Sequence, residues 1–427
     1  TWFSSGLWPF FTLGWPEKTN ELDFFYPTNV LVTGYDIIFF WVARMIFFGI
    51  EMMGEIPYAF VSIHGIVRDS LGRKMSKSLN NGIDPLEVID KFGADALRFS
   101  LAAGSAPGAD MRFYWEKVES ARNFCNKIWN ASRFVMMNLE GATIDSELKS
   151  MDISDKWILT KMDRLIEKVT DNLEKFEFGL AAGNAYDFAW SEFCDWYIEM
   201  AKPRLYGDNE ADKATANGVL VTVLTTILKL LHPLMPFITE EIYLSLPNAD
   251  ATIMTSEWPK SSRYAYGDET AAMESVMELI RQIRNIRAEM NVGPGKKAKL
   301  LLKTSGEKKA QLKACEAYLI KLAYASDIAF IESDMDIPKN AVSVVAEIAE
   351  CFMPLGDLID IEKEIERLEK ELAETDGEIK RCAGKLANKG FTDKAPEAVI
   401  KAEEEKLAKY TEMKQKIGDR LAALKER

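Results

Sequence analysis

The sequence predicts a chain of mixed class, α/β at its start and mainly α afterwards, that ends in an antiparallel coiled coil. Three observations carry this prediction. Residues 1–105 alternate short β-branched runs with helical patterns. From Trp115 onward, apolar residues recur at three- and four-residue spacing over long stretches. Near the end, apolar residues fall into a heptad pattern. The chain has 427 residues, 48% of them hydrophobic, so several domains with real cores are expected.

Changes in these patterns divide the chain into four expected domains. An α/β domain with connecting helices comes first, then a helical domain, a small α/β domain with a basic patch, and a coiled-coil arm. Their boundaries are placed at 1–114, 115–269, 270–352 and 353–427.

Composition limits the class of protein. The formal net charge of −13 argues against a polyanionic partner, but charges act within about 8–10 Å, so local patches decide. The five cysteines form no C-x-x-C pair, which argues against a paired-cysteine zinc site and indicates reduced, cytoplasmic thiols. Residues 37–50 are apolar but contain Arg44 and are shorter than the roughly 20 residues of a membrane span, so we predict a buried core helix. The start at Thr1 without Met predicts a fragment of a larger protein.

The first candidate site is a basic loop. It has the sequence Gly-Arg-Lys-Met-Ser-Lys-Ser over residues 72–78, and Asn81-Gly82 follow it as a turn signal. Lysine ammonium groups, serine hydroxyls and backbone N–H groups suit a polyphosphate. A solvated surface turn is the alternative. A buried strand over 60–67 is expected before the loop. After it, Asp84-Pro85 predicts a helix whose N-terminus faces the anion site, with Gly93 as its left-handed cap.

A second candidate site follows the strand predicted at 30–33. A strand end that opens into a helix is where ligands bind in open α/β sheets, and Asp36 stands at this turn. A helix N-cap is an equally good interpretation of its carboxylate. For Trp2 and Trp41, the sequence alone favours plain core packing over a ligand pocket.

The Lys-Met-Ser-Lys-Ser loop resembles the signature loop of class I aminoacyl-tRNA synthetases, which closes over ATP in a Rossmann-type catalytic domain. Residues Thr1–Ser5 together with Val32–Trp41 closely resemble the valine-specific enzymes of this class, whereas the isoleucine and leucine enzymes differ here. The resemblance implies ATP with Mg²⁺ as substrate, no tightly bound metal, and catalytic roles for Lys74 and Lys77. It further implies ATP-binding residues Lys74, Ser76, Lys77, Ser78, His64 and Gly65, and amino-acid-binding residues Trp2, Asp36, Ile37 and Trp41.

The helical part contains two further runs of this resemblance. Residues 122–130 and 231–241 resemble helices of the anticodon-binding domain of the valine, isoleucine and leucine enzymes. The aromatic residues between 188 and 197 could stack bases, but their spacing favours core packing. His232 precedes Pro233 and is expected to mark a helix end. Residues 281–303 form a local basic patch typical of phosphate binding, with a solvated surface as the alternative. The predicted tRNA-binding residues are Asn123, Lys127, Arg133, Arg281, Arg284, Arg287, Lys296 and Lys297.

The C-terminal heptads predict two helices. They turn at residues 388–390, and Pro396 opens the second helix, which gives an antiparallel hairpin. The valine enzymes end in such an arm, which contacts tRNA. A dimerising coiled coil is the alternative.

The resemblance thus predicts the C-terminal half of a synthetase that joins valine to tRNA(Val), cytoplasmic and monomeric, with no membrane partner. Members of the class also carry an early His-Ile-Gly-His type motif on the same phosphates, but the only two histidines, His64 and His232, do not form one. The editing domain is also missing. The chain alone is therefore expected to be inactive. A non-catalytic tRNA-binding module and a sibling isoleucine or leucine enzyme remain as alternatives.

Overall fold

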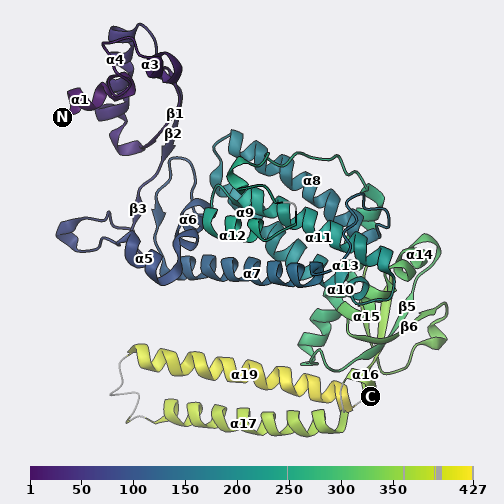
Figure 1. Cartoon of the computed structure of the whole chain (residues 1–427). Helices are drawn as coiled ribbons and strands as arrows, with labels where there is room; N and C mark the ends of the chain where they lie inside the picture. Colours follow the sequence, from purple (N-terminus) through teal and green to yellow (C-terminus); the bar gives the residue numbers. More distant parts are fainter. Residues whose placement is uncertain (248, 359–360, 389, 391–396, 426–427) are drawn as a thin grey trace. The chain divides into compact units, whose positions relative to one another are not determined.

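The computed structural model describes residues 1–247, 249–358, 361–388, 390 and 397–425. The chain forms two compact units, residues 1–270 and 271–427, and each is described by itself (Figure 1).

The N-terminal part of the first unit is built around a two-stranded parallel sheet. Strand β1 (Thr28–Gly34) pairs with β2 (Tyr58–His64), and the chain between them forms a 3₁₀ turn, a π-helical turn and helix α4 (Ala43–Met53). Three short helices precede the sheet: α1 (Trp2–Gly6), α2 (Trp8–Phe11) and α3 (Asn20–Phe25). The core between the sheet and its crossover is small and centres on Val42, Met45 and Tyr58. The parallel crossover explains why the carboxyl ends of both strands lie at one edge.

Two burial predictions for this region are wrong. The predicted core helix over 37–50 has a buried side, but Phe39 is 83% exposed and Phe47 49% exposed. The strand predicted as buried has Phe60 61% exposed. The physical reason is the sheet itself, since two strands offer too little surface to cover all apolar side chains of the crossover. Parallel sheets normally have both faces covered.

The basic loop lies between two further short strands. Strand β3 (Val67–Arg68) pairs in parallel with β4 (Met111–Arg112), and the loop holds a 3₁₀ turn over Lys77–Leu79. Helix α5 (Pro85–Phe92) begins as predicted, because the Asp84 side chain accepts a hydrogen bond from the Leu86 N–H. It ends at Gly93 with φ 91° and ψ 153°, which is positive as expected but not left-handed helical. Helix α6 (Ala94–Ala103) follows.

A helical bundle completes the first unit. Its helices are α7 (Trp115–Leu139), α8 (Ile153–Glu174), α9 (Phe178–Asp187), a π-helical segment η4 (Phe188–Tyr197), α10 (Ile198–Leu205), α11 (Glu210–Leu231) and α12 (Pro236–Leu244). The predicted core packing of the aromatic run is confirmed for Phe188, Phe193, Trp196 and Tyr197, which are all buried. Helix α11 ends at Leu231, directly before His232, as expected.

Two features of the bundle concern its stability. Asp155, which is fully buried, accepts hydrogen bonds from Tyr197 Oη at 2.6 Å and Arg204 Nη1 at 2.5 Å. Among the described residues, only α11 has the length and apolar composition of a membrane span. Because 78% of that apolar window is buried inside the bundle, it is typical of a core helix.

The second unit contains a four-stranded sheet in the order β6-β5-β8-β7. Its strands are β5 (Ala298–Lys303), β6 (Ala325–Ile331), β7 (Ala341–Val345) and β8 (Glu350–Pro354). Helix α13 (Gly267–Glu289) leads into the unit, α14 (Gly306–Ala314) and α15 (Glu316–Leu322) connect β5 to β6, and α16 (Leu355–Leu358) follows β8. The expected domain boundary at 352/353 falls inside strand β8.

The C-terminal arm is a hairpin of α17 (Ile361–Ala387) and α19 (Glu397–Lys425), which lie side by side (Figure 1). The ion pairs Lys385–Glu403 and Lys414–Asp376 show that the helices are antiparallel, because positions rise on one helix as they fall on the other. Heptad residues Leu368, Cys382, Ile417 and Leu421 are buried between them. The predicted turn includes Lys389, and the predicted helix start is Pro396; both lie outside the described residues.

Candidate active site and candidate tRNA surface

The candidate active site forms where β1 and β2 end. Gly34 and His64 are partners in the parallel register, so the turn after β1 and the end of β2 lie together. Asp36 projects from the 3₁₀ turn that follows β1. The carboxyl edge of a parallel sheet is the common place for a ligand in an α/β fold.

Asp36 faces the basic loop. Its Oδ2 lies 3.5 Å from Lys74 Nζ, and both side chains are substantially exposed, at 39% and 63%. The helix-cap interpretation is wrong, because no side chain caps the 3₁₀ turn, the π-helical turn or α4 in this described stretch. The structure thus brings together two residues that the sequence placed in separate subsites.

Asp69, which sequence reasoning missed, organises the loop. Its side chain is buried and accepts from the backbone N–H groups of Leu71 at 3.1 Å and Arg73 at 2.8 Å. Its second oxygen accepts from Arg73 Nε at 2.7 Å and Asn81 Nδ2 at 2.9 Å. The hydrogen bond from Asn81, and then those from Arg73, lower the pKa of Asp69 to about 2. The signal in the sequence was Asp-Ser-Leu-Gly, a typical turn composition that leads to Gly72 at φ 83°.

Asn81 closes the loop at its other end. Its Oδ1 accepts from the Ser76 N–H at 2.9 Å, and the Ser76 and Ser78 hydroxyls lie 3.1 Å apart. Ser76 also caps the 3₁₀ turn that begins at Lys77, through the Leu79 N–H at 3.3 Å. Within the part of the chain that is described, Lys77 has no ion-pair partner, so its ammonium is available to a ligand.

The remaining predicted residues of this site lie around the two strands. Trp2 is 40% exposed and its ring centroid lies 5.8 Å from that of Phe40. Trp41 packs against the Val42–Met45–Tyr58 core, and its Nε1 donates to Ser5 O at 3.2 Å. Ile37 is half-buried. Trp41 therefore has a packing role in the structure, whereas the Trp2 indole stays accessible.

His64 and Gly65 end the second strand. The exposed His64 ring has Nδ1 2.8 Å from Gly65 O. A Cβ at Gly65 would lie 1.9 Å from Ala109 O, so only glycine fits this close approach. No group of His, Cys, Asp or Glu suited to a metal ion occurs among the described residues, and the absence of a bound metal stays a prediction.

Two of the predicted tRNA-binding residues line one cavity. Asn123 and Lys127 on α7 border a cavity of about 470 Å³, and its other lining residues are Asn126, Asn130, Ala131, Phe134, Cys194, Ile198 and Lys202. Lys127 Nζ lies 2.5 Å from Asp195 Oδ1 and 3.9 Å from the centroid of the Trp190 ring. Arg133 is exposed on the same helix but does not line the cavity.

The basic patch of the second unit divides into buried and exposed residues. Arg287 is 2% exposed, and its Nη2 donates to the carbonyl oxygens of Gly293, at 3.0 Å, and Lys296. The predicted tRNA contact of Arg287 is therefore wrong for this structure, because the guanidinium lies inside and holds the 293–296 turn. Arg284 is half-buried, with Nε donating to Leu322 O at 2.7 Å.

The other three predicted tRNA-binding residues of the patch face solvent. Arg281 is exposed and pairs with Glu278 at 3.0 Å. Lys296 and Lys297 are exposed in the turn that Arg287 holds. These two lysines are the cations of the patch best placed to reach a phosphate.

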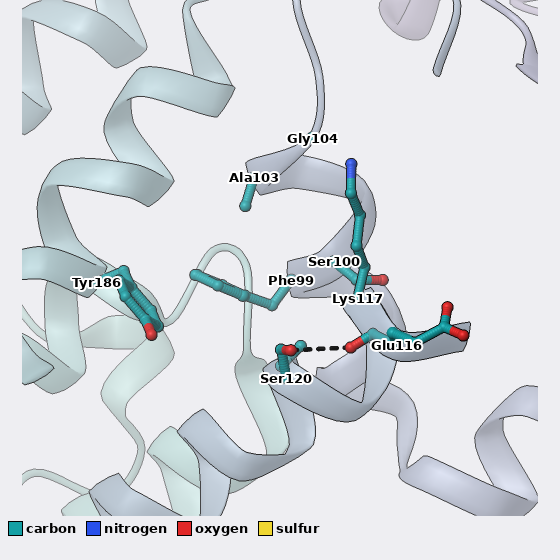
Figure 2. Close-up of a pocket in the computed structure, with 9 residues that line it drawn as sticks. Phe99, Ser100, Ala103, Gly104, Glu116, Lys117, Ser120 and Tyr186 are labelled. Atoms are coloured by element: carbon teal, nitrogen blue, oxygen red, sulfur yellow. Dashed lines mark hydrogen bonds between the residues drawn. The ribbon is translucent and has the colours of Figure 1, made fainter. Parts of the chain in front are cut away.

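A further cavity, of about 330 Å³, lies between α6, α7 and α9 (Figure 2). Phe99 and Tyr186 form its apolar side, and Glu116, Lys117 and Ser120 of α7 form its polar side. The Ser120 hydroxyl donates a hydrogen bond to the Glu116 carbonyl oxygen at 2.8 Å. None of the predicted site residues lines this cavity, so it belongs to neither candidate site.

Comparison with known families identifies the class. Residues 1–114 match the model of tRNA synthetases class I (I, L, M and V). Residues 155–302 match the anticodon-binding domain of tRNA ligase, and residues 360–425 match the valyl tRNA synthetase tRNA binding arm. The matches follow the order of the elements along the chain, from the strands with the loop to the hairpin.

Comparison with individual relatives identifies the family within this class. A valine–tRNA ligase of Clostridium acetobutylicum is 56% identical over 428 residues, which cover 100% of this chain and 49% of that protein. One of Clostridium perfringens is 55% identical over 428 residues, 99% of this chain and 48% of that protein. The chain belongs to the valine–tRNA ligase family. It spans about half the length of the curated relatives that it matches.

Among solved structures, the LeuRS of a ternary LeuRS–tRNA–LeuAMS complex from Agrobacterium radiobacter K84 is similar, with 17% identity and a TM-score of 0.49. The likeness covers 74% of this chain and 38% of that one.

Proposed function

We propose that this protein takes part in the ATP-dependent joining of valine to tRNA(Val). A valine carboxylate oxygen would attack the α-phosphorus of ATP, which releases pyrophosphate and leaves valyl-adenylate. A hydroxyl of the terminal ribose of tRNA would then attack the valyl carbonyl and release AMP. The observation that supports this most directly is the contact between Asp36 and Lys74, because it joins the end of β1 to the basic loop.

In this proposal the loop acts on the phosphates. Lys74 and Lys77 stabilise the charge that develops on the leaving pyrophosphate, while Ser76, Ser78 and nearby backbone groups donate hydrogen bonds. Mg²⁺ enters with ATP as part of the substrate. His64 and Gly65 border the nucleotide at the end of β2. Lys77 is exposed and has no ion-pair partner among the described residues, which supports its role. Lys74 would exchange its exposed pairing with Asp36 for a phosphate when ATP and valine enter.

Trp2, Asp36, Ile37 and Trp41 are proposed to receive valine. Asp36 would pair with the substrate ammonium, and the apolar side chains would surround the isopropyl group. The exposed indole of Trp2 supports direct contact, whereas Trp41 would act by supporting the wall of the pocket.

Each unit is proposed to contact tRNA separately, the first unit through the cavity beside α7 and the second through the exposed part of the basic patch. Asparagine amides can bond base edges, and Phe134 offers a ring for stacking. Lys296, Lys297, Arg281 and Arg133 would contact phosphates, with Arg284 as a lesser contact. The hairpin arm would add a separate contact. We further propose that the protein is cytoplasmic and monomeric, with domains 1–114, 115–269, 270–360 and 361–427; the last boundary is moved from the expected 352/353 because Asp357 and Leu358 pack on the small domain.

Valine-dependent exchange of pyrophosphate into ATP tests the proposed chemistry. The full-length gene product should exchange with valine and not with isoleucine or leucine. The 427-residue chain alone should bind valine tRNA but show negligible exchange. A full-length product that binds tRNA without any exchange would instead identify a non-catalytic tRNA-binding module.

A further inference from the structure

Asp110 joins three segments that lie far apart in the sequence. Its Oδ2 accepts from Tyr35 Oη at 3.1 Å and from Arg68 Nε at 2.5 Å. Its Oδ1 accepts from the Ile66 backbone N–H at 2.7 Å. The carboxylate is thus held by a phenol, a guanidinium and a backbone amide at once. Hydrogen bonding, from Ile66 first and then from Arg68, lowers the pKa of Asp110, so it is an anion at neutral pH.

Each of the three segments leads to the candidate active site. Tyr35 directly precedes Asp36, and Ile66 follows the His64-Gly65 end of β2. Arg68 begins the path to the loop, because its Nη1 donates to Gly72 O at 3.4 Å and its backbone forms a bridge with Lys74.

The backbone around this carboxylate is fixed as well. A Cβ at Gly65 would lie 2.5 Å from Asp110 N and 1.9 Å from Ala109 O. The backbone at Gly65 is therefore in direct contact with the backbone of residues 109–110. The pairing of β3 with β4, Val67 with Met111 and Arg68 with Arg112, continues this contact. Because the backbone at Asp110 is fixed by this contact, its side chain can hold Tyr35 and Arg68 in fixed positions relative to the strand ends.

We propose that Asp110 is a positioning residue that aligns the Tyr35–Asp36 turn with the Lys74–Lys77 loop, and thereby the valine subsite with the phosphate subsite. This inference rests on the proposed function. Asp110 contacts neither Asp36 nor the loop lysines, so it acts through Tyr35 and Arg68. A displacement of about 1 Å between reacting groups costs on the order of 100-fold in rate, which sets the scale of the effect.

The test is a double-mutant cycle in the full-length gene product. Asp110→Ala should lower kcat for valine-dependent pyrophosphate exchange by about 10- to 100-fold, with smaller changes in the KM values of valine and ATP, because alignment matters most in the transition state. Tyr35→Phe removes only the hydroxyl and should cost less. In the background of Asp110→Ala, Tyr35→Phe should cost nothing more, because its acceptor is already gone. Asp90→Asn, at an exposed position of α5, is the matched control and should leave exchange unchanged.

A second measurement separates positioning from folding. In the 427-residue chain, hydrogen exchange of Asp110→Ala should rise together at residues 35–42 and 66–82, while the helical bundle keeps its protection and tRNA affinity is unchanged. Fully additive losses in the cycle, or loss of protection across the whole first unit, would make Asp110 a general structural residue and overturn the inference. If the wild-type protein shows no exchange at all, the proposed function fails. The coupled protection of the two segments then decides the alignment by itself: a rise at both upholds it, and a rise at one alone or at neither overturns it.

Discussion

Lys74 Nζ lies 3.5 Å from Asp36 Oδ2, although 38 positions separate the two residues. Asp36 follows β1, and Lys74 follows β3. This pair ties the basic loop to the turn after β1 without a ligand present. Because both side chains are substantially exposed, the pair itself contributes little to stability. Its importance is geometric, since an entering substrate can compete for either partner.

The contact gives Asp36 a specific test. Asp36→Ala in the full-length gene product should raise the KM of valine more than that of ATP, because the proposed partner is the substrate ammonium. We expect a loss of roughly 2–5 kcal/mol in valine binding if that ammonium is left unpaired in a closed site. Steady-state exchange with each substrate varied separately measures both. A rise confined to ATP would reassign Asp36 to the nucleotide, through Lys74.

Lys77 should behave differently from Asp36. Lys77→Ala should lower the rate of adenylate formation by about 100- to 1,000-fold, while valine affinity stays nearly constant, because the ammonium acts on developing phosphate charge. Lys18→Ala, an exposed lysine of the first unit, is the matched control. Rapid-quench measurement of adenylate formation separates rate from binding. A loss of valine binding with an unchanged rate would give the loop a structural role instead.

Asp69 holds the loop in the structure, which predicts a change visible without any substrate. Asp69→Asn keeps the size of the side chain but removes the charge that pairs with Arg73. Hydrogen exchange over residues 69–82 of the 427-residue chain should increase by about tenfold or more, while helix α5 stays protected. Because its folded pKa is about 2, the wild-type carboxylate stays charged and its stabilisation is complete above about pH 4; it declines only as the pH falls toward 2. Wild-type protection, corrected for intrinsic exchange, should therefore be constant between about pH 5 and 8. An unchanged exchange pattern in the variant would show that Asn81 alone suffices.

The extent of sequence-based prediction differs between local and long-range features. The loop, the Asp84 cap and the hairpin heptads were predictable because each depends on neighbours within a few positions. The π-helical turn at 38–42 was not, since one additional residue per turn leaves no clear periodicity. Asp110 was missed because its partner Tyr35 is 75 positions away. Arg287 was placed on the surface with its basic neighbours, but the ring of Tyr324, 5.3 Å from its guanidinium carbon, and two carbonyl groups hold it inside.

The buried network in the bundle predicts a large stability effect. Asp155→Ala should lower the free energy of unfolding by about 2–3 kcal/mol, because it removes the acceptor of the Tyr197 hydroxyl and the shorter ion pair of Arg204 in a water-poor site. Arg204 keeps Asp152 at 3.3 Å and the carbonyl oxygens of Ser150 and Asp212, each at 3.2 Å. Tyr197→Phe should cost about 1–2 kcal/mol. Urea unfolding of the 427-residue chain, followed by circular dichroism, measures both. Asp208→Ala, an exposed position, should change stability by less than about 0.5 kcal/mol. An effect of Asp155→Ala no larger than that of the control would show that the remaining acceptors of Arg204 suffice and that the Tyr197 hydroxyl finds another acceptor.

Binding of tRNA tests the exposed cations and the arm together. Affinity should fall with salt by close to one log unit per log unit of salt for each phosphate neutralised, so Lys296→Ala with Lys297→Ala should reduce the slope by up to about two. Lys260→Ala with Lys339→Ala, at exposed positions outside the patch, is the matched pair and should leave the slope nearly unchanged.

The arm should be removed by a truncation after residue 360 and not at 357. The Lys299 N–H donates to Asp357 Oδ2 at 3.1 Å, and the side chain of Leu358 is buried, so a cut at 357 would damage the small domain. The truncated chain should unfold like the parent in its remaining part, because the core of the hairpin lies between its own two helices. Its affinity for valine tRNA should fall at every salt concentration, whereas the preference over a non-cognate tRNA should persist if the helical bundle reads the anticodon. Filter binding across a salt series measures both. Unchanged affinity after truncation would leave the hairpin without a role in binding, and sedimentation of the parent chain would then decide whether it dimerises instead.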